Sequence, residues 1–168
     1  MISGDKQKQI DYYINKGTYK TNRLNVSSFK VYGDGALGSR GAAMRKSYSD
    51  RENHFGALIY SPERYQEIAK QIAASDFQMN THAIGDSANT WLLKTYKDAL
   101  KDAKNRRWRI EHAQIIAPED FDKFDNILPS IQPTHATSDM YWAEDRVGSN
   151  RIKGAYAYKN LLNKYGKI

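Results

Sequence analysis

The sequence of 168 residues contains no cysteine. It therefore forms no disulfides and no thiolate metal sites, and it leaves the cellular compartment undecided. No apolar run approaches the roughly 20 residues that a membrane-spanning helix needs. The first 20 residues are polar and lack the apolar core of a secretory signal. We therefore expect no membrane partner, and a cytoplasmic location is the default expectation.

Signatures of nucleic-acid recognition are also missing, although the formal net charge is +7. Lysine and arginine are scattered along the chain, and the one short basic cluster spans residues 104–107. No recognition helix, zinc finger or aromatic RNA-binding motif accompanies this cluster, so we expect no nucleic-acid partner. A composition of 40% hydrophobic and 27% charged residues predicts a folded globular chain, and the length predicts one domain.

Apolar segments of the length and composition of strands alternate along the chain with segments of helical periodicity. Strands are expected at residues 27–32, 77–82, 108–112 and 128–132. Helices are expected at residues 61–73, 86–100, 117–124 and 150–163, with long loops at 36–60 and 134–148. Ser61 and Pro62 are typical of a helix start, and Gly166 is typical of a helix end.

This alternation predicts a parallel sheet with right-handed crossovers. About four strands form either a small open sheet or half of an eight-stranded (β/α) barrel. We favour the half barrel, because the chain begins without a clear strand and residues 167–168 read as the start of another one. The expected organisation is a polar segment at residues 1–26, with a short helix ending near Gly17, followed by a partial TIM-type α/β barrel at 27–168.

Two histidines end successive expected strands, and such positions share one rim of a parallel sheet. His82 and His112 are therefore candidate metal ligands, since neutral imidazole binds zinc and similar metals. The alternative is that each is bonded to a neighbouring carboxylate or carbonyl. Lys30 faces the barrel interior if Phe29 and Val31 face the helices, because side chains alternate along a strand. The alternative is an edge-strand lysine that reaches solvent.

Further polar residues lie near the expected strand ends or in the loops. Asp34, between two glycines, could hold the following loop or orient a ligand. His135 could contact substrate or lie exposed in its loop, and substrate contact is the favoured interpretation. Asp86 is expected to cap a helix, Glu111 to point away from the rim, and His54 to lie on the surface.

Four motifs occur in a fixed order along most of the chain. They are FKVYGDGALGSR at 29–40, HAIGD at 82–86, RIEHAQ at 109–114 and QPTHATSD at 132–139. Together they resemble the amidohydrolase family 3 group of the amidohydrolase superfamily. This group includes predicted metal-dependent hydrolases with a TIM-barrel fold and exoenzyme regulatory proteins of the AepA type. The resemblance extends from about residue 25 to residue 168.

The resemblance implies roles for individual residues. Lys30, often carboxylated in such enzymes so that it bridges two metals, would join His82 and His112 as ligands of a divalent metal, zinc being the expected one. The reaction implied is hydrolysis of a C–N bond, of amide or formamide type, in a small molecule through a metal-activated water. The residues implied to line the substrate pocket are Asp34, Arg40, His135 and Asp139.

The sequence also departs from the family pattern. It has no His-x-His pair, and it has no final strand carrying the aspartate that serves as ligand and proton shuttle. No complete catalytic set is therefore expected in this chain. We expect part of a longer hydrolase that is inactive alone and associates with itself or with a missing barrel half. A non-catalytic remnant or interaction module that keeps the fold is the alternative.

Overall fold

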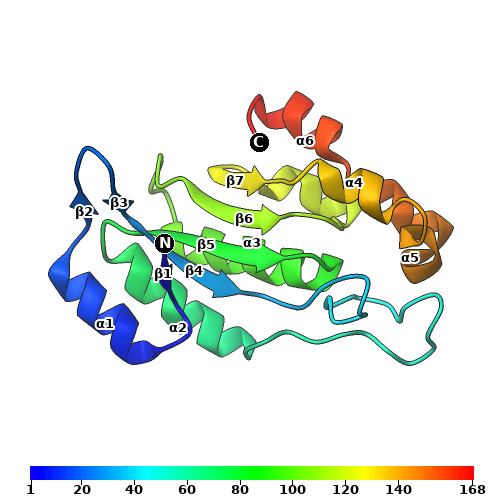
Figure 1. The fold of residues 1–168 in the computed structure, drawn as a ribbon, viewed down its shortest axis with the longest axis horizontal. Helices are drawn as coiled ribbons and strands as arrows, with labels where there is room; N and C mark the ends of the chain where they lie inside the picture. Colours follow the sequence, from blue (N-terminus) through cyan, green and yellow to red (C-terminus); the bar gives the residue numbers. More distant parts are fainter.

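The computed structural model describes all of residues 1–168, built around a five-stranded parallel sheet (Figure 1). The strand order is β1-β4-β5-β6-β7. The strands are β1 (Ile2–Ser3), β4 (Ser28–Tyr32), β5 (Gln78–Ala83), β6 (Trp108–His112) and β7 (Ile127–Ser130). A separate hairpin pairs β2 (Tyr19–Lys20) with β3 (Asn25–Val26). The prediction of a parallel sheet alternating with helices, as in part of a TIM-type barrel, is confirmed.

Along the chain, helices or 3-10 turns connect the strands of the large sheet, and three further helices follow β7. The helices are α1 (Gln7–Lys16), α2 (Pro62–Ala73), α3 (Asp86–Leu100), α4 (Thr134–Asp139), α5 (Ala143–Arg151) and α6 (Tyr158–Tyr165), with 3-10 turns η1 (Pro118–Lys123) and η2 (Ile152–Gly154). The Ser61 side chain accepts a hydrogen bond from the Arg64 amide at 3.4 Å, and Pro62 occupies the first turn of α2. Both features were expected from the sequence. No helix combines the length and the apolar character that crossing a membrane requires.

The two faces of the sheet differ because side chains alternate along each strand. Phe29, Val31, Met79 and Ile110 are fully buried against the core that α2 and α3 complete. Figure 1 shows both helices on the same side of the sheet. The opposite face carries half-buried polar side chains and is covered by no helix, as expected for the inner face of an open barrel. Lys30 lies on this inner face, which agrees with the interior position that strand alternation predicts.

The N-terminal segment takes part in the sheet more than its sequence indicated. Ile2 of β1 pairs with Phe29 of β4, which makes five strands rather than about four. Ile10 of α1 is fully buried in the main core. A two-residue strand is too short to produce a recognisable alternation, so this pairing was not foreseen. The expected helix end is confirmed, since α1 stops at Lys16 and Gly17 has a φ of 80°.

The region after β7 differs from its prediction. Residues 134–148 were expected to form a polar loop, but α4 and most of α5 lie there. The expected helix at 150–163 is divided, because Tyr156 has a φ of 51° and interrupts it between η2 and α6. Of these short helices, α5 lacks a helical apolar period and is instead held by the packing of Ala143 and Val147. Residues 167–168 form no strand, although Gly166 ends α6 as predicted.

The loop at residues 36–60 is anchored by a second apolar cluster. The cluster joins this loop to the residues following β5 and β6 and to α5; its buried members are Leu37, Ala42, Met44, Tyr48, Ile84, Ile115, Ala143 and Val147. Arg45 adds polar contacts, since its guanidinium lies 2.7 Å from the buried carboxylate of Asp120. The long loop is therefore packed over the carboxyl ends of the strands, where α/β proteins build their sites.

Candidate active-site rim

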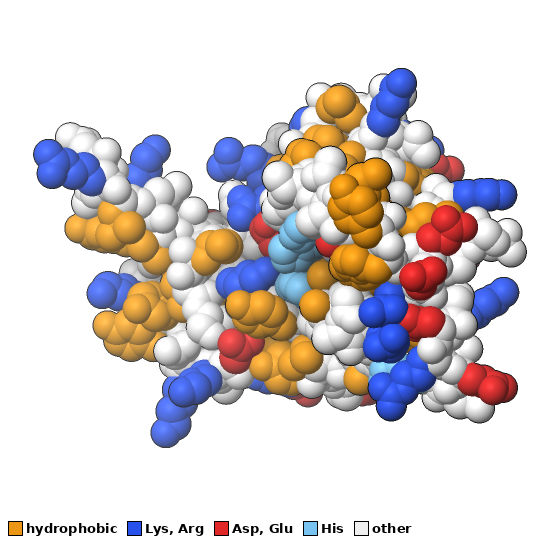
Figure 2. Space-filling view, turned by 45° about the vertical axis from the view of Figure 1, so that its right-hand side comes forward, with side chains coloured by type: hydrophobic (Ala, Val, Ile, Leu, Met, Phe, Trp, Pro, Cys, Tyr) orange, Lys and Arg blue, Asp and Glu red, His pale blue; other side chains and the backbone are white.

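Three of the four histidines form a row at the carboxyl ends of the strands. The ring centroids of His82 and His112 are 4.6 Å apart, with an interplanar angle of 72°. His135 of α4 stacks on His112 at 5.4 Å and 24°. Figure 2 shows histidine side chains gathered near the middle of one face, beside basic and hydrophobic groups. The structure therefore brings together two of the three predicted ligands and one predicted substrate contact.

Strand alternation alone would not have placed His112 in this row. In the sheet register His112 pairs with Ala83. Met79, Thr81 and Ala83 are alternate residues of β5 and are all buried on the helix-covered face, so regular alternation would point His112 to that face too. His112 has a φ of 78°, in the left-handed region that non-glycine residues rarely adopt. This backbone turn interrupts the alternation and brings the imidazole beside His82.

The surroundings of His112 favour its neutral form. Burial lowers its pKa below the ordinary value, and the nearby His82 lowers it further. Its Nδ1–H donates to the side-chain oxygen of Gln132, which leaves Nε2 as the ring nitrogen with a free lone pair. An imidazole held in this tautomer is suited to bind a metal. Gln132 was not predicted as a site residue, although it lies in the last of the four motifs.

Lys30 is half-buried on the inner face, with its Nζ 4.9 Å from the centroid of the Tyr32 ring. Burial lowers its pKa, and the negative charge of Glu111 opposes that effect. The Tyr32 ring lies 5.8 Å from the His82 ring, which connects Lys30 to the histidine row. The alternative of an edge-strand lysine is wrong, because β4 lies between β1 and β5.

Glu111 was expected to point away from the rim, and this expectation is wrong. It pairs in register with His82 and therefore shares the inner face with it. Its carboxylate accepts hydrogen bonds from Arg109 Nε and Ser130 Oγ, both at 2.8 Å. The expectation failed because the left-handed backbone at His112 interrupts the alternation of β6. Glu111 and His112 therefore both point to the inner face.

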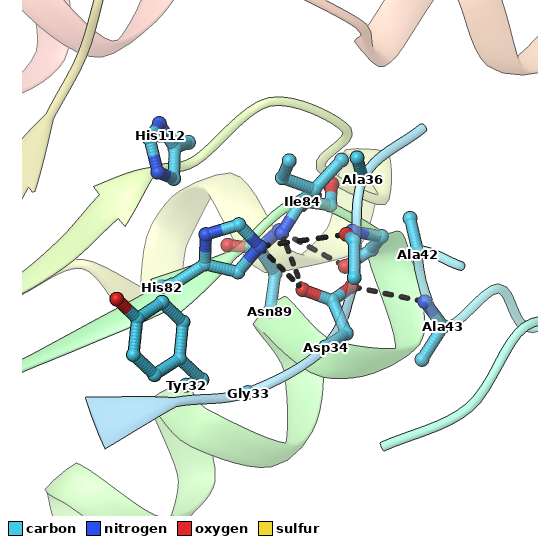
Figure 3. A network of polar contacts seen from close by, with 12 residues as sticks. Tyr32, Gly33, Asp34, Ala36, Ala42, Ala43, His82, Ile84, Asn89 and His112 are labelled. Carbon is cyan, nitrogen blue, oxygen red and sulfur yellow. Dashed lines mark hydrogen bonds and ion pairs between the residues drawn. The ribbon is translucent and has the colours of Figure 1, made fainter. Parts of the chain in front are cut away.

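Asp34 is buried, with 2% of its surface exposed, and its carboxylate is bonded to the backbone. One oxygen accepts from the amides of Ala43 and Gly85 at 2.9 and 2.8 Å, and the other from Ile84 at 3.0 Å. Figure 3 shows these contacts beside His82, whose Nε2 lies 3.4 Å from the nearer carboxylate oxygen. Asp34 thus holds the long loop to the turn after β5, one of the two roles expected for it.

The other predicted pocket residues have different surroundings. Arg40 forms a two-point ion pair with Asp50, whose closest contact is 2.9 Å. Asp139 accepts from Gln114 and Tyr156, so its carboxylate is engaged within the chain. His135 is half-buried, and its Nδ1 is buried without a hydrogen-bond partner.

Two minor expectations are corrected. His54 was expected on the surface but is half-buried, with its Nε2 2.8 Å from the Arg40 carbonyl oxygen. Asp86 was expected to cap α3, but Gly85 occupies the N-cap position and Asp86 is the first residue of the helix. Asp86 instead accepts from the Arg45 amide at 2.9 Å. In both cases the partner is a distant loop residue that a local pattern cannot identify.

The rim supplies only part of a metal site. No group of three or more histidine, aspartate or glutamate side chains has an arrangement suited to holding a metal ion. His82 and His112 provide two imidazoles, and Lys30 lies on the same face. Catalytic zinc usually has three protein ligands. The donors therefore fit an incomplete divalent-metal site.

The fold and the rim together define a partial α/β barrel with histidines at the carboxyl ends of its strands, the arrangement of a barrel hydrolase. This chain belongs to the amidohydrolase family, whose sequence model matches residues 4–167. The resemblance recognised from the four motifs is thereby confirmed.

Individual relatives agree with this assignment. Protein LONG AFTER FAR-RED 3 of Arabidopsis thaliana is 34% identical over 92% of the chain and 27% of its own length. Putative amidohydrolase YtcJ of Bacillus subtilis is 31% identical over 84% of the chain and 27% of its own length. Exoenzymes regulatory protein AepA of Pectobacterium carotovorum is 24% identical over 86% of the chain and 31% of its own length. The chain thus spans about a third or less of each relative.

Solved structures are similar over nearly the whole chain. An uncharacterized metal-dependent hydrolase from Pyrococcus horikoshii superposes with a TM-score of 0.84 and 28% identity, covering 96% of this chain and 32% of the other. One from Pyrococcus furiosus gives a TM-score of 0.82 at the same identity, covering 96% and 33%. The fold of this chain is therefore that of one part of a larger hydrolase barrel.

Proposed function

We propose that this chain carries part of the metal-binding rim of an amidohydrolase that hydrolyses a C–N bond of amide or formamide type. The observation that supports this most directly is the pair of imidazoles from adjacent strand ends, 4.6 Å apart. The similar Pyrococcus proteins, described as metal-dependent hydrolases, give independent support. The proposed substrate is a small molecule, because the family is one of amidohydrolases.

In this proposal Lys30, His82 and His112 hold a divalent metal, with zinc as the first candidate. When bound, the metal supplies the polarisation and water activation that amide hydrolysis requires. The chain's own contribution is to keep His112 neutral through burial and to fix its tautomer through Gln132. Partial desolvation of Lys30 lowers its pKa, which favours the neutral amine that carboxylation would need.

We assign substrate contact first to His135, since the half-buried ring stacks on His112 at the end of the histidine row. Asp34, Arg40 and Asp139 remain predicted substrate contacts. Each of these three would have to give up a partner within the chain to bind a ligand directly. Weaker binding of N-acyl or N-formyl compounds by His135→Ala, without loss of metal affinity, would support this order.

We further propose that residues 1–168 alone are a poor catalyst. The two imidazoles provide fewer ligands than the three usual for catalytic zinc, and a protonated lysine has no lone pair with which to bind a metal. The sequence has no His-x-His pair to add more ligands. No residue of the rim is placed as an evident proton shuttle to the leaving nitrogen. The alternative is a non-catalytic remnant or interaction module, which would keep the fold and bind no metal.

Metal analysis and an activity screen test these proposals together. Purified chain is equilibrated with zinc, its bound metal is measured, and N-acyl and N-formyl compounds are offered as substrates. We expect weak zinc binding that is lost in His82→Ala and His112→Ala, with negligible turnover. His54→Ala is the matched control, because His54 is a histidine away from the row. Turnover that His112→Ala abolishes would contradict the poor-catalyst proposal, and absence of zinc binding would support the non-catalytic alternative.

We also propose that the chain associates through its uncovered edge and inner face. β7 is an outer strand of the sheet, and such a strand offers unpaired backbone groups to another chain. Light scattering over a range of concentrations should show dimers or larger species. Leu128→Lys places a charge on β7 and should shift the chain toward monomer, whereas Leu162→Lys on the exposed side of α6 should not. A monomer at every concentration would refute the proposal.

A further inference from the structure

The end of β6 contains two consecutive non-glycine residues with left-handed backbone. His112 has a φ of 78° and Ala113 a φ of 44°. Such a conformation is unfavourable for a residue with a Cβ, and it persists only where the surroundings enforce it. The turn is also what brings the His112 imidazole beside His82. Whatever enforces the turn therefore determines the geometry of the rim.

The adjacent residue, Gln114, belongs to a closed set of side-chain hydrogen bonds. Its Nε2 donates to the Asp139 carboxylate at 3.0 Å and to the Tyr156 hydroxyl at 2.8 Å. The Tyr156 hydroxyl donates to the same carboxylate oxygen at 2.9 Å. Gln114 is only 2% exposed, and Asp139 and Tyr156 are half-buried. We call Gln114, Asp139 and Tyr156 the rim clasp.

Backbone contacts reinforce the rim clasp. The Tyr156 amide donates to the Gln114 carbonyl at 2.8 Å, and the Ile116 amide donates to the Gly154 carbonyl at 3.1 Å. Ile115 and Ala155 form an antiparallel bridge between the same two segments. A Cβ at Gly154 would lie 2.3 Å from the Ile116 carbonyl oxygen, so only glycine permits this approach. The segment that follows His112 is thus held both by the side-chain hydrogen bonds of Gln114 and by the backbone hydrogen bonds of Gln114 and Ile116.

The Gln114 amide nitrogen, the Tyr156 hydroxyl and both oxygens of Asp139 are engaged in hydrogen bonds. The second oxygen of Asp139 accepts from Ser138 at 2.8 Å, and Tyr156 itself has a φ of 51°. The observed effect of these bonds is to join α4 and the turn before α6 to the strained end of β6.

We propose that Gln114, Asp139 and Tyr156 are positioning residues that keep His112 turned onto the inner face beside His82. The placement of the ring follows from the geometry alone, whereas its consequence for metal binding rests on the proposed function. Without the rim clasp the left-handed turn relaxes toward extended backbone. The His112 side chain then returns to the alternation of β6 and leaves the row.

Tyr156→Phe tests the placement, because it removes one hydroxyl and keeps the ring. The readout is the nuclear Overhauser effect between the ring protons of His82 and His112, which requires no metal. We expect at least a twofold loss of that effect. Tyr158→Phe is the matched control, since the Tyr158 hydroxyl is buried without a partner, and it should leave the effect unchanged. Gln114→Met provides a second variant of similar size.

Rescue separates positioning from general stabilisation. Glycine adopts left-handed backbone without the Cβ penalty, so adding Ala113→Gly to Tyr156→Phe should restore the effect between the two rings. A purely structural role predicts a lower melting temperature with no change in ring proximity. If folded Tyr156→Phe and Gln114→Met both keep the wild-type effect, the proposal is refuted.

Zinc affinity supplies the second readout. Residues that orient a metal ligand typically change affinity about 10- to 100-fold when altered. We expect Tyr156→Phe to weaken zinc binding about 10-fold and the double variant to recover most of it. If wild-type chain binds no zinc, the proposed function fails, and the ring effect still decides the positioning proposal.

Discussion

Replacing Asp34 with asparagine should destabilise the fold, because one carboxylate accepts three backbone amides. The amide of asparagine keeps one oxygen and replaces the other with an NH₂ group, which can only donate. With the oxygen toward Ala43 and Gly85, the NH₂ group faces the Ile84 amide and leaves that donor unsatisfied. With the opposite orientation, two donors lose their acceptor. At least one buried N–H is therefore left unbonded in either case.

The magnitude follows from the number of bonds lost. A hydrogen bond to a charged group contributes about 1.5–3 kcal/mol, and an unsatisfied buried donor costs about 1–3 kcal/mol. Asp34→Asn should therefore lower the free energy of unfolding by roughly 2–4 kcal/mol. For a domain of this size, that corresponds to a drop in Tm of about 10 °C. Asp34→Ala, which removes all three bonds, should cost more.

Urea unfolding followed by circular dichroism measures this change. The midpoint should fall while the slope stays the same, because the surface exposed on unfolding hardly changes. Asp122→Asn is the matched control: its side chain is 76% exposed and pairs only with Lys164, so its effect should stay below about 1 kcal/mol. Equal midpoints for Asp34→Asn and wild type would refute the role assigned to the carboxylate.

Two further predictions concern the buried hydroxyl of Tyr65 and the close backbone contact at Gly85. Burial raises the pKa of Tyr65 to about 12, whereas the unfolded chain has a tyrosine pKa of about 10. The unfolded state therefore loses the proton first, and stability should fall as pH rises from about 10 toward 12, with a smaller fall in Tyr65→Phe, as urea midpoints over this range would show. Gly85→Ala should unfold at markedly lower urea, because its Cβ would lie 2.0 Å from the Ala43 carbonyl oxygen. Gly17→Ala, with no atom within 4 Å, should show only the smaller cost of its φ of 80°, and equal losses at both sites would contradict the steric argument.

Local patterns in the sequence were sufficient for the main elements. Alternation and apolar content located β4, β5, β6 and β7 to within about two residues, and the serine-proline start located α2. These features depend on neighbours along the chain, so no tertiary information is needed to recognise them. The histidines at two strand ends were recognisable for the same reason, whereas the family was recognised by the resemblance of four ordered motifs.

Only the tertiary structure decided how the rim is assembled. Strand alternation would have turned His112 toward the helices, and the turn that prevents this is held by Gln114 and by Tyr156, 42 residues further along the chain. The short strand β1 exists because β4 offers it a partner, and α5 lacks a strong apolar pattern but packs Val147 into the second cluster. Contacts between distant segments leave no period in the sequence. Their free energy arises only when folding brings the partners together.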